Sequence, residues 1–298
     1  MEKNDRNMLT LGYLKEASYS ALDKFVAFVT AQDAKSSRRV KAFVDAMNAK
    51  ASSIGVNNSH FSDPSGFVSK DSRSTASDIA TVFSHVMADP KIAAVLEKNT
   101  GEMSIAGRAR RTRVIESTVC RDLFTDSDFR ILAGKTGTSP CNAYNVAFIA
   151  RASDDSLFLC SLLGSDSEEN RWKDSLASLT CAYDRRRGID TKALDVTAKS
   201  VSVRTYPEGE EVVSKNPDES VVPASLTKLM AALTASEYLT DWDVKVRVQR
   251  NDLTKGSGNN LRFGDYVTVR DLFYDMLIPS SNTAAHVLAR LAGKELDK

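Results

Sequence analysis

The chain has 298 residues, of which 42% are hydrophobic and 27% charged, and this balance excludes a disordered or fibrous protein. At ~150 residues per domain, the length allows one large domain or two small ones. Forty basic and 39 acidic side chains give a formal net charge of +1, so no nucleic-acid partner is expected. No apolar run approaches the ~18 residues of a membrane helix. The first residues do not begin a signal peptide, which leaves open a cytosolic protein or an exported domain whose signal has been removed.

The first third of the chain is predicted to be mostly helical. Apolar side chains at helical spacing predict one or two amphipathic helices over residues 8–31 and another over residues 40–47. Residues 57–74 are rich in turn-forming side chains and predict a long loop. A helix is expected to start at Ser74 or Thr75, because Asp78 follows at the spacing of a helix cap.

The middle of the chain is predicted to form a sheet. Three apolar stretches indicate strands, a helix follows them, and two further strands are joined by a turn at residues 207–209. The strands are expected at 129–133, 144–150, 156–163, 195–206 and 210–215, and the helix at 166–183. Another helix begins near Pro223, and the remainder is predicted to be mostly helical. The pattern favours an antiparallel sheet covered by helices and attached to a helical part.

The cysteines and histidines give no sign of a metal site. The four cysteines contain no Cys-x-x-Cys pair, and their spacing favours free thiols, although four could form two disulfides in three pairings. The three histidines are scattered, and each is expected to be a surface or a satisfied core residue. These residues are Cys120, Cys141, Cys160, Cys181, His60, His85 and His286.

A Ser-x-x-Lys motif stands at Ser225-Leu226-Thr227-Lys228. On a helix this spacing places both side chains on one face, so that the amine can take the proton of the hydroxyl group. Pro223 suits a helix entrance, where free N–H groups favour developing negative charge. The motif alone has low specificity, and the alternative is an exposed helix start.

Two further short motifs carry polar side chains next to apolar elements. Lys135-Thr136-Gly137-Thr138 follows an apolar strand, where a lysine, a hydroxyl group and a small residue could hold a carboxylate. Ser280-Ser281-Asn282 lies between two apolar helices, unlike the Ser-x-Asn matches at 214–216 and 257–259, which lie in polar stretches. Taken singly, the first could be a strand end and the second a helix cap.

Together, Ser-x-x-Lys, Ser-x-Asn and Lys-Thr-Gly resemble the signature of the penicillin-recognising serine enzymes. Their surroundings are similar to the low-molecular-weight penicillin-binding proteins, which are serine-type D-Ala-D-Ala carboxypeptidases. The similarity lies in VVPASLTKLMAALTA, FVDAMNAKASSIGVNNSHFSDPSGF and GKTGTSPCNAYNVAFIARASDDSLFLCSLLG. It covers about residues 36–184 and 195–293. It implies an α/β (α+β) fold of the β-lactamase/transpeptidase-like type, with a five-stranded antiparallel sheet covered by helices and an all-helical part.

The order of the motifs differs from that of the family, in which Ser-x-x-Lys comes first and Lys-Thr-Gly last. We interpret the chain as a circular permutant, with the old ends joined through residues 185–194 and new ends opened between the helices at 283–293 and 40–51. This predicts an N-terminal helical extension at 1–35 and one catalytic domain at 36–298. In that domain the helical part is about 36–128 and 241–298, and the sheet part about 129–240. The alternative is a chain with halves of two successive domains, completed by exchange with a second molecule.

The resemblance implies a catalytic role for four residues. Ser225 would attack the carbonyl carbon of the terminal D-Ala-D-Ala bond and form an acyl-enzyme. Lys228 would be the base, and it must be partly neutral, which burial and the positive charge of Lys135 would favour. Ser280 would relay a proton to the leaving amine. Asn282 would bind the substrate amide and orient Lys228.

The resemblance also implies the substrate contacts. Lys135 and Thr136 would hold the terminal carboxylate, and Gly137 would leave room for the substrate. The backbone N–H groups of Ser225 and Thr138 would form an oxyanion hole. Water would release the acyl group, and no metal or cofactor is needed. The partners expected are peptidoglycan stem peptides ending in D-Ala-D-Ala and β-lactam inhibitors.

Other functions stay open at this point. A β-lactamase shares the three motifs, but there is no Glu-x-x-Leu-Asn of the class A enzymes, and Ser281 stands where they have Asp. A sensor or binding module could be acylated without turnover, and a degenerate or engineered chain could hold a misaligned site. By resemblance the protein would be extracytoplasmic, in the cell envelope or secreted, with any membrane anchor absent from this chain.

Overall fold

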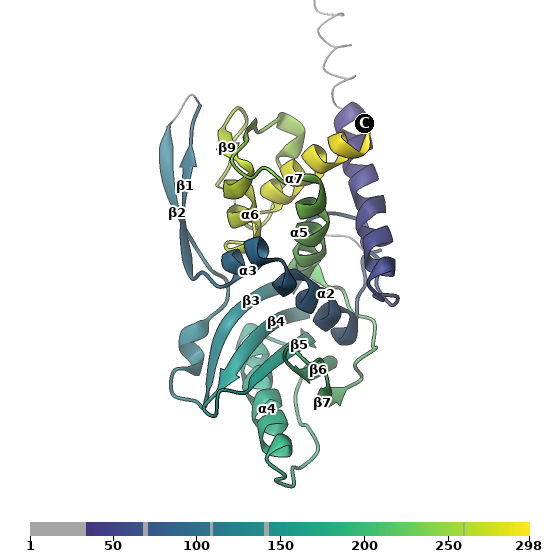
Figure 1. Ribbon diagram of the computed structural model, residues 1–298, viewed down its shortest axis with the longest axis vertical. Coiled ribbons are helices and arrows are strands. Elements are labelled where there is room, and N and C mark those ends of the chain that lie inside the picture. The colour runs from purple at the N-terminus through teal and green to yellow at the C-terminus, as the bar shows by residue number, and fades with distance from the viewer. Residues whose placement is uncertain (1–33, 68–70, 108–109, 140–142, 259) are drawn as a thin grey trace, which may run out of the picture.

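The computed structural model describes residues 34–67, 71–107, 110–139, 143–258 and 260–298 (Figure 1). The helices expected at 8–31 and the thiol of Cys141 lie outside these residues. The helix expected at 40–47 is present within a helix over residues 34–53, and the loop expected after it is confirmed for its described residues. The thiols of Cys120, Cys160 and Cys181 are free.

The predicted five-stranded antiparallel sheet is present, with the strand order β3-β4-β5-β6-β7. Its strands are β3 (Phe129–Ser139), β4 (Ala143–Ala152), β5 (Leu157–Ser165), β6 (Ser200–Thr205) and β7 (Glu211–Lys215). The fourth strand was expected from residue 195 but begins at Ser200. The backbone N–H groups of Thr197 and Ala198 donate instead to the carboxylate of Asp174, at 3.0 and 2.9 Å, which keeps this segment out of the sheet.

Helices cover both faces of the sheet (Figure 1). The predicted helix α4 (Glu168–Arg186) packs against one face, where Trp172 and Leu179 meet Phe148 and Phe158 in one hydrophobic core. Helix α2 (Ala76–Ala88) packs against the other face, and the hydroxyl group of Thr75 caps it as expected, accepting a hydrogen bond from the backbone N–H of Asp78 at 3.0 Å.

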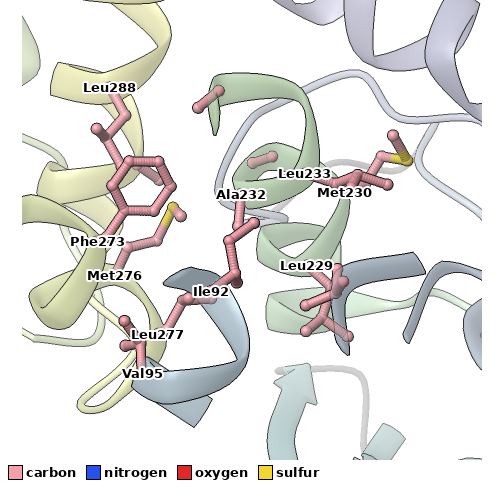
Figure 2. Packing of buried hydrophobic residues seen from close by; sticks show 14 of the residues in the cluster. Ile92, Val95, Leu229, Met230, Ala232, Leu233, Phe273, Met276, Leu277 and Leu288 are labelled. Carbon is pink, nitrogen blue, oxygen red and sulfur yellow. The ribbon is translucent and has the colours of Figure 1, made fainter. Parts of the chain in front are cut away.

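The second core belongs to the helical part. Helices α3 (Pro90–Leu96), α5 (Thr227–Tyr238), α6 (Val269–Leu277) and α7 (Asn282–Leu296) surround it. Figure 2 shows Ile92 of α3 close to Ala232 of α5, with Phe273 and Met276 of α6 and Leu288 of α7 beside them. Helix α5 is buried around most of its surface, so the helix that follows Ser225 is fixed on all sides.

The part expected to be all-helical also contains two small antiparallel pairs, which corrects that expectation. They are β1 (Thr100–Ile105) with β2 (Arg111–Glu116), and β8 (Lys245–Arg247) with β9 (Tyr266–Thr268). Three 3-10 turns also occur, η1 (Arg121–Phe124), η2 (Ala224–Leu226) and η3 (Arg250–Asp252). The strand pattern was obscured because β1 and β2 each bury only one or two side chains, such as Met103, Ile105 and Ile115.

The helix over residues 34–53 lies beside the end of α7 (Figure 1). A Cβ on Gly293 would stand 2.1 Å from the backbone oxygen of Arg39, so only glycine permits this contact. The guanidinium groups of Arg38 and Arg39 each lie 3.4 Å from the Asp297 carboxylate.

In the described part of the chain, no single helix is long and apolar enough to cross a membrane. The helices α2 and α3 are bent by 111° relative to each other, and only by their combined length and composition could this pair cross a membrane. Its apolar side chains belong to the core of the protein.

Candidate active site

The three motifs come from distant parts of the chain and meet at one place. Two hydrogen bonds of 2.8 and 2.9 Å connect them, and a third of 2.8 Å lies within the Ser-x-x-Lys motif. The amine of Lys228 donates to the Ser225 hydroxyl group and to the Asn282 amide oxygen, and the amine of Lys135 donates to the Ser280 hydroxyl group. The site therefore lies between strand β3, the start of α5 and the turn between α6 and α7.

Ser225 lies in a strained turn. Residue 224, an alanine, has a φ of +49°, a conformation that costs free energy for a residue with a side chain. The turn is held from below by Asn145 of β4, whose amide group donates to the backbone oxygens of Val222 and Pro223 at 2.9 and 3.1 Å. The helix predicted near Pro223 begins with the 3-10 turn η2 and continues as α5 from Thr227.

Lys228 is fully buried and has three hydrogen-bond partners. Its Nζ atom lies 2.8 Å from the Ser225 hydroxyl group, the Asn282 amide oxygen and the backbone oxygen of Ser65. Burial lowers its pKa to about 7, and the negative charge of Asp63 opposes this shift in part.

These partners suit both protonation states of Lys228: an ammonium group donates to all three oxygens, and a neutral amine donates to two of them and faces the serine with its lone pair. A neutral amine has two N–H groups and one lone pair. The oxygens of Asn282 and Ser65 can only accept, so the two N–H groups satisfy them, and the lone pair is left for the hydroxyl hydrogen of Ser225. In this state Lys228 is a base in contact with a hydroxyl group, and its pKa of about 7 makes the state well populated near neutral pH.

The backbone oxygen that Lys228 needs is supplied by a turn at residues 63–67. The Asp63 carboxylate accepts hydrogen bonds from the backbone N–H groups of Ser65 and Gly66, both at 2.8 Å. Burial raises the pKa of Asp63, but the contact with His286 at 3.2 Å and the hydrogen bonds from Ser65 outweigh burial and lower the pKa to about 2. The carboxylate is therefore ionised and fixes the turn.

Lys135 and Ser280 form the second polar pair of the site. Lys135 is fully buried and also donates to the backbone oxygen of Thr136 at 2.9 Å. Burial, together with the positive charges of Lys228 and Arg171, holds the pKa of Lys135 well below its usual range. Ser280 has a φ of +68°, so the backbone is strained at Ser280 as well as next to Ser225. A bound anion would compensate the buried charge of Lys135.

The remaining residues of the Lys-Thr-Gly-Thr motif line the same end of β3. Thr136 is nearly buried, and its hydroxyl group donates to the hydroxyl group of Thr118 at 2.6 Å. A Cβ on Gly137 would lie 2.7 Å from the backbone oxygen of Pro223 and 3.2 Å from the nitrogen of Ser225. Glycine at position 137 thus lets β3 approach the nucleophile turn, a reason beyond the space for substrate that the sequence suggested.

Arg171 of α4 extends this positive end of the site, and sequence reasoning missed it. Its guanidinium group donates to the Thr138 hydroxyl group at 3.2 Å and to Glu168 at 3.0 Å, and its Nε atom has no hydrogen-bond partner among the described residues. The side chain is only 2% exposed, and burial lowers its pKa. Arg171 lies in a helix with an ordinary amphipathic pattern, so no local feature marks it as part of the site.

The turn after α6 is supported by a buried carboxylate. The backbone oxygen of Asp275 accepts from the N–H of Ser281 at 2.8 Å, and its side chain accepts from the Asn260 amide at 2.8 Å. Burial raises the pKa of Asp275 to about 6, although the hydrogen bonds of Asn260 and Ser281 oppose the shift. The amide nitrogen of Asn282 donates to the backbone oxygen of Lys255 at 2.8 Å. The segment before β9 therefore supports the Ser-x-Asn motif at two residues, Lys255 and Asn260.

Comparisons with known proteins match two enzyme families to successive parts of the chain. A D-alanyl-D-alanine carboxypeptidase family model matches residues 28–163, and a beta-lactamase enzyme family model matches residues 190–296. D-alanyl-D-alanine carboxypeptidase DacF of Bacillus subtilis (strain 168) is 28% identical over 120 residues, which are 38% of this chain and 31% of DacF. The aligned part thus spans about a third of that relative. No solved structure gives a significant match.

These matches, which lie over successive parts of the chain, support a penicillin-recognising serine hydrolase. The chain's mixed architecture, a five-stranded antiparallel sheet covered by helices, is that of the β-lactamase/transpeptidase-like fold. Within this class, the first part of the chain matches the D-alanyl-D-alanine carboxypeptidase family.

Proposed function

We propose that the protein is a serine-type D-Ala-D-Ala carboxypeptidase that hydrolyses peptidoglycan stem peptides through an acyl-enzyme on Ser225. The observation that carries this proposal is the contact between the Ser225 hydroxyl group and the Lys228 amine at 2.8 Å, in a site where burial lowers the lysine pKa to about 7. A hydroxyl group needs a base of this kind to become a nucleophile at neutral pH.

In the proposed acylation, Lys228 takes the hydroxyl proton as the oxygen of Ser225 attacks the carbonyl carbon. The backbone N–H groups of Ser225 and Thr138 would stabilise the oxyanion, at about 3 kcal/mol for each donor. The leaving amine of the terminal D-Ala receives a proton from Ser280, which is hydrogen-bonded to Lys135. Lys228 returns the first proton to Ser280, so that the amine is neutral again before water attacks the acyl-enzyme. Lys228 then accepts a proton from the water and passes it to the Ser225 oxygen as the ester bond breaks.

We assign the terminal carboxylate of the substrate to the positive end of β3. Lys135 and Thr136 would hold it, with Arg171 close by through Thr138. Lys135 is buried and donates only to uncharged oxygens, and the buried Nε of Arg171 has no hydrogen-bond partner among the described residues, although Glu168 pairs with its guanidinium group. A bound carboxylate would remove the cost of burying these groups. This explains a preference for peptides with a free C-terminus. The same contacts would accept the carboxylate of a penicillin.

The first experiment is intact-protein mass spectrometry after exposure to penicillin, with peptide mapping of the adduct. The wild-type protein should gain one penicilloyl group on Ser225, and Ser225→Ala should gain none. Ser236→Ala is a matched control on the same helix, because its hydroxyl group only caps a backbone oxygen of Leu233, and it should label normally. A wild-type protein without an adduct would contradict the proposal.

Release of D-Ala from a peptide ending in D-Ala-D-Ala separates the related functions. A carboxypeptidase should release D-Ala and should not act on the same peptide ending in L-Ala. Labelling without release would indicate a sensor or binding module instead. The beta-lactamase enzyme family match over 190–296 makes rapid hydrolysis of a chromogenic cephalosporin the second candidate, and turnover of that compound without D-Ala release would favour it.

We also propose that the order of the motifs reflects a circular permutation of one catalytic domain. The proposal is supported by the contact between the helix over 34–53 and α7, which places the two proposed new ends side by side. A chain rearranged to run from 195 to 298, through a short linker, and then from 36 to 184 should fold and be labelled by penicillin. Native mass spectrometry tests the rival: a labelled monomer excludes obligatory exchange between two molecules.

The proposed location is extracytoplasmic, in the cell envelope or secreted, because the stem peptides of peptidoglycan lie there. Fractionation of the source cells, with antibody detection, tests this directly.

A further inference from the structure

A cluster of exposed cations and aromatic rings lies away from the candidate active site, where β8, β9, η3 and the start of β2 come together. Arg247 lies over the rings of both Phe263 and Tyr266, at 5.4 and 6.0 Å, and Arg250 lies over the Phe263 ring at 5.4 Å. The two aromatic side chains are large and unusually exposed, at 52% and 42%. We call these four residues, with Arg110 and Lys245, the basic aromatic surface.

A groove of about 660 Å³ continues this surface between the β1–β2 hairpin and the β8–β9 pair. Arg110, Lys245 and Tyr266 line it. The backbone of Tyr266 pairs with that of Ala106 through two hydrogen bonds of 2.8 Å, so the hairpin is fixed to one wall of the groove. Tyr266 belongs to both the groove and the arginine cluster, which makes the two parts continuous.

The positive charge of this surface is not compensated locally. Arg110, Lys245, Arg247 and Arg250 form no ion pair with a described residue, whereas their neighbours Arg111 and Arg290 are paired with Asp265 and Asp252. One acidic side chain lines the groove, Asp271, and its carboxylate accepts hydrogen bonds from the backbone and the hydroxyl group of Thr268. Two guanidinium groups around one phenyl ring repel each other, and an anion between them would relieve that repulsion.

The chemistry of the surface favours phosphate. A guanidinium group stacked on a ring keeps its N–H groups free at the edge, in the fork that matches two oxygens of one phosphate. Stacking also fixes the side chain in advance, which lowers the entropic cost of binding. A groove followed by a row of cations suits a linear molecule with several negative charges, whereas the plane of a bilayer would touch only its rims.

We propose that the basic aromatic surface binds a linear polyanion whose charges are phosphate groups. The polyanion runs along the groove past Arg110 and Lys245 and ends between the guanidinium groups of Arg247 and Arg250. Phe263 already carries two guanidinium groups, so little of the ring is left to stack on a nucleic-acid base. The overall charge of +1 means that this binding depends on local charge and not on the protein as a whole.

The test measures binding of the full chain to fluorescently labelled inorganic polyphosphate at fixed ionic strength. The variant R110Q/R247Q/R250Q should bind at least about tenfold more weakly, and the slope of log Kd against log salt should fall by about 0.7 for each lost contact. K35Q/R38Q/K41Q removes three positive charges from the helix over residues 34–53 and should bind within about twofold of wild type, because its charges lie outside the surface. Equal weakening of both variants would overturn the proposal.

Two further variants leave the net charge unchanged. They test whether the aromatic rings position the guanidinium groups before the ligand binds. Phe263→Leu should weaken binding about two- to fivefold, as expected for loss of the cation–π contacts. R247K/R250K should also weaken it, because a lysine amine cannot form two parallel bonds to one phosphate. Wild-type affinity in both variants would overturn the assignment to stacked guanidinium groups.

Two other probes test the identity of the occupant. Binding that is tighter to a single-stranded oligonucleotide of equal charge, or to phosphatidylglycerol vesicles, would overturn the polyanion in favour of nucleic acid or a membrane. Circular dichroism and penicillin labelling of each variant confirm that it is folded.

Discussion

The protein holds two groups of cations that differ in their contact with water. Lys135, Lys228 and Arg171 are buried, and burial lowers the pKa of each. Arg247 and Arg250 are exposed and lie on aromatic rings. Burial lets the Lys228 amine lose its proton and act as a base, whereas an exposed guanidinium group keeps its charge and can only attract. Burial of the cations, and not their number, therefore decides which of the two regions can catalyse a reaction.

Replacement of the buried base gives the largest expected effect. Lys228→Met should slow acylation by penicillin by about 10²- to 10⁴-fold, the range expected for loss of a general base. The melting temperature should fall moderately, because methionine leaves the buried oxygens of Ser65 and Asn282 without this donor. Stopped-flow labelling and calorimetry measure the two effects. A large fall in stability together with the rate would place Lys228 among structural residues instead.

The pH dependence of acylation tests the same side chain without a mutation. Because the pKa of Lys228 is about 7, the amine is protonated and inactive at lower pH. The acylation rate should therefore rise about tenfold per pH unit up to about pH 7 and level off above it. A flat profile between pH 5 and 8 would show that no group with this pKa limits the reaction.

Arg171 is expected to act on binding more than on chemistry. Arg171→Gln should raise KM and lower kcat/KM about ten- to hundredfold for a peptide with a free carboxylate, as expected for one charge-assisted hydrogen bond. The same peptide with a C-terminal amide serves as the control, because it has no carboxylate to lose. If kcat/KM falls equally for both peptides, Arg171 has only a structural role.

Asp275 extends the comparison to a buried acid. Its pKa is raised from 3.8 to about 6, so the folded protein binds this proton more tightly than the unfolded chain. The contribution of Asp275 to the free energy of unfolding is therefore fully present at low pH. It is lost as the pH rises from about 4 through 6, by an amount on the order of 3 kcal/mol.

Asp275→Asn removes that dependence and keeps an oxygen that can accept from Asn260. Denaturant unfolding of both proteins at pH 4.5 and pH 7 should show the variant gaining relative to wild type at the higher pH. The exposed Asp45→Asn variant serves as the control and should show no such gain. A parallel response of wild type and Asp275→Asn would contradict the buried ionisation.

The smallest effect is expected for the exposed region. Arg247→Gln should change the free energy of unfolding by less than about 1 kcal/mol, because its contacts are exposed cation–π pairs. Chemical denaturation measures this change. A larger loss would mean that Arg247 serves the fold, and the contrast with the buried amines would weaken.

Much of the fold could be predicted because its elements follow simple patterns. The central strands β4 and β5 of the large sheet are apolar runs buried on both faces, and α2 has a polar cap at its start. The two small strand pairs were missed, since strands of three to six residues with few buried side chains have no clear period.

The motifs indicated three parts of the site, and their meeting depends on the fold. The Ser65 oxygen, Asn145 and Arg171 could not be predicted from local sequence. A backbone oxygen has no sequence signature. The two side chains gain their roles only when the fold brings Asn145 of β4 to the Ser225 turn and Arg171 of α4 to Thr138 of β3. Asp275 stands in an apolar helix, and that mismatch with its surroundings was the one available signal.

The contact between the helix over residues 34–53 and α7 also bears on how the protein is made. It joins side chains 258 residues apart in the chain, and the Lys135 strand is synthesised before the segments that carry Ser225 and Ser280. Ribosomes synthesise the chain from the N-terminus. The early helices and strands therefore lack their packing partners until the later segments have been synthesised. Such distant contacts fold slowly and leave apolar surface open to aggregation. We expect this chain to depend on chaperones, or on slow translation, more than a domain whose site is completed by neighbouring segments.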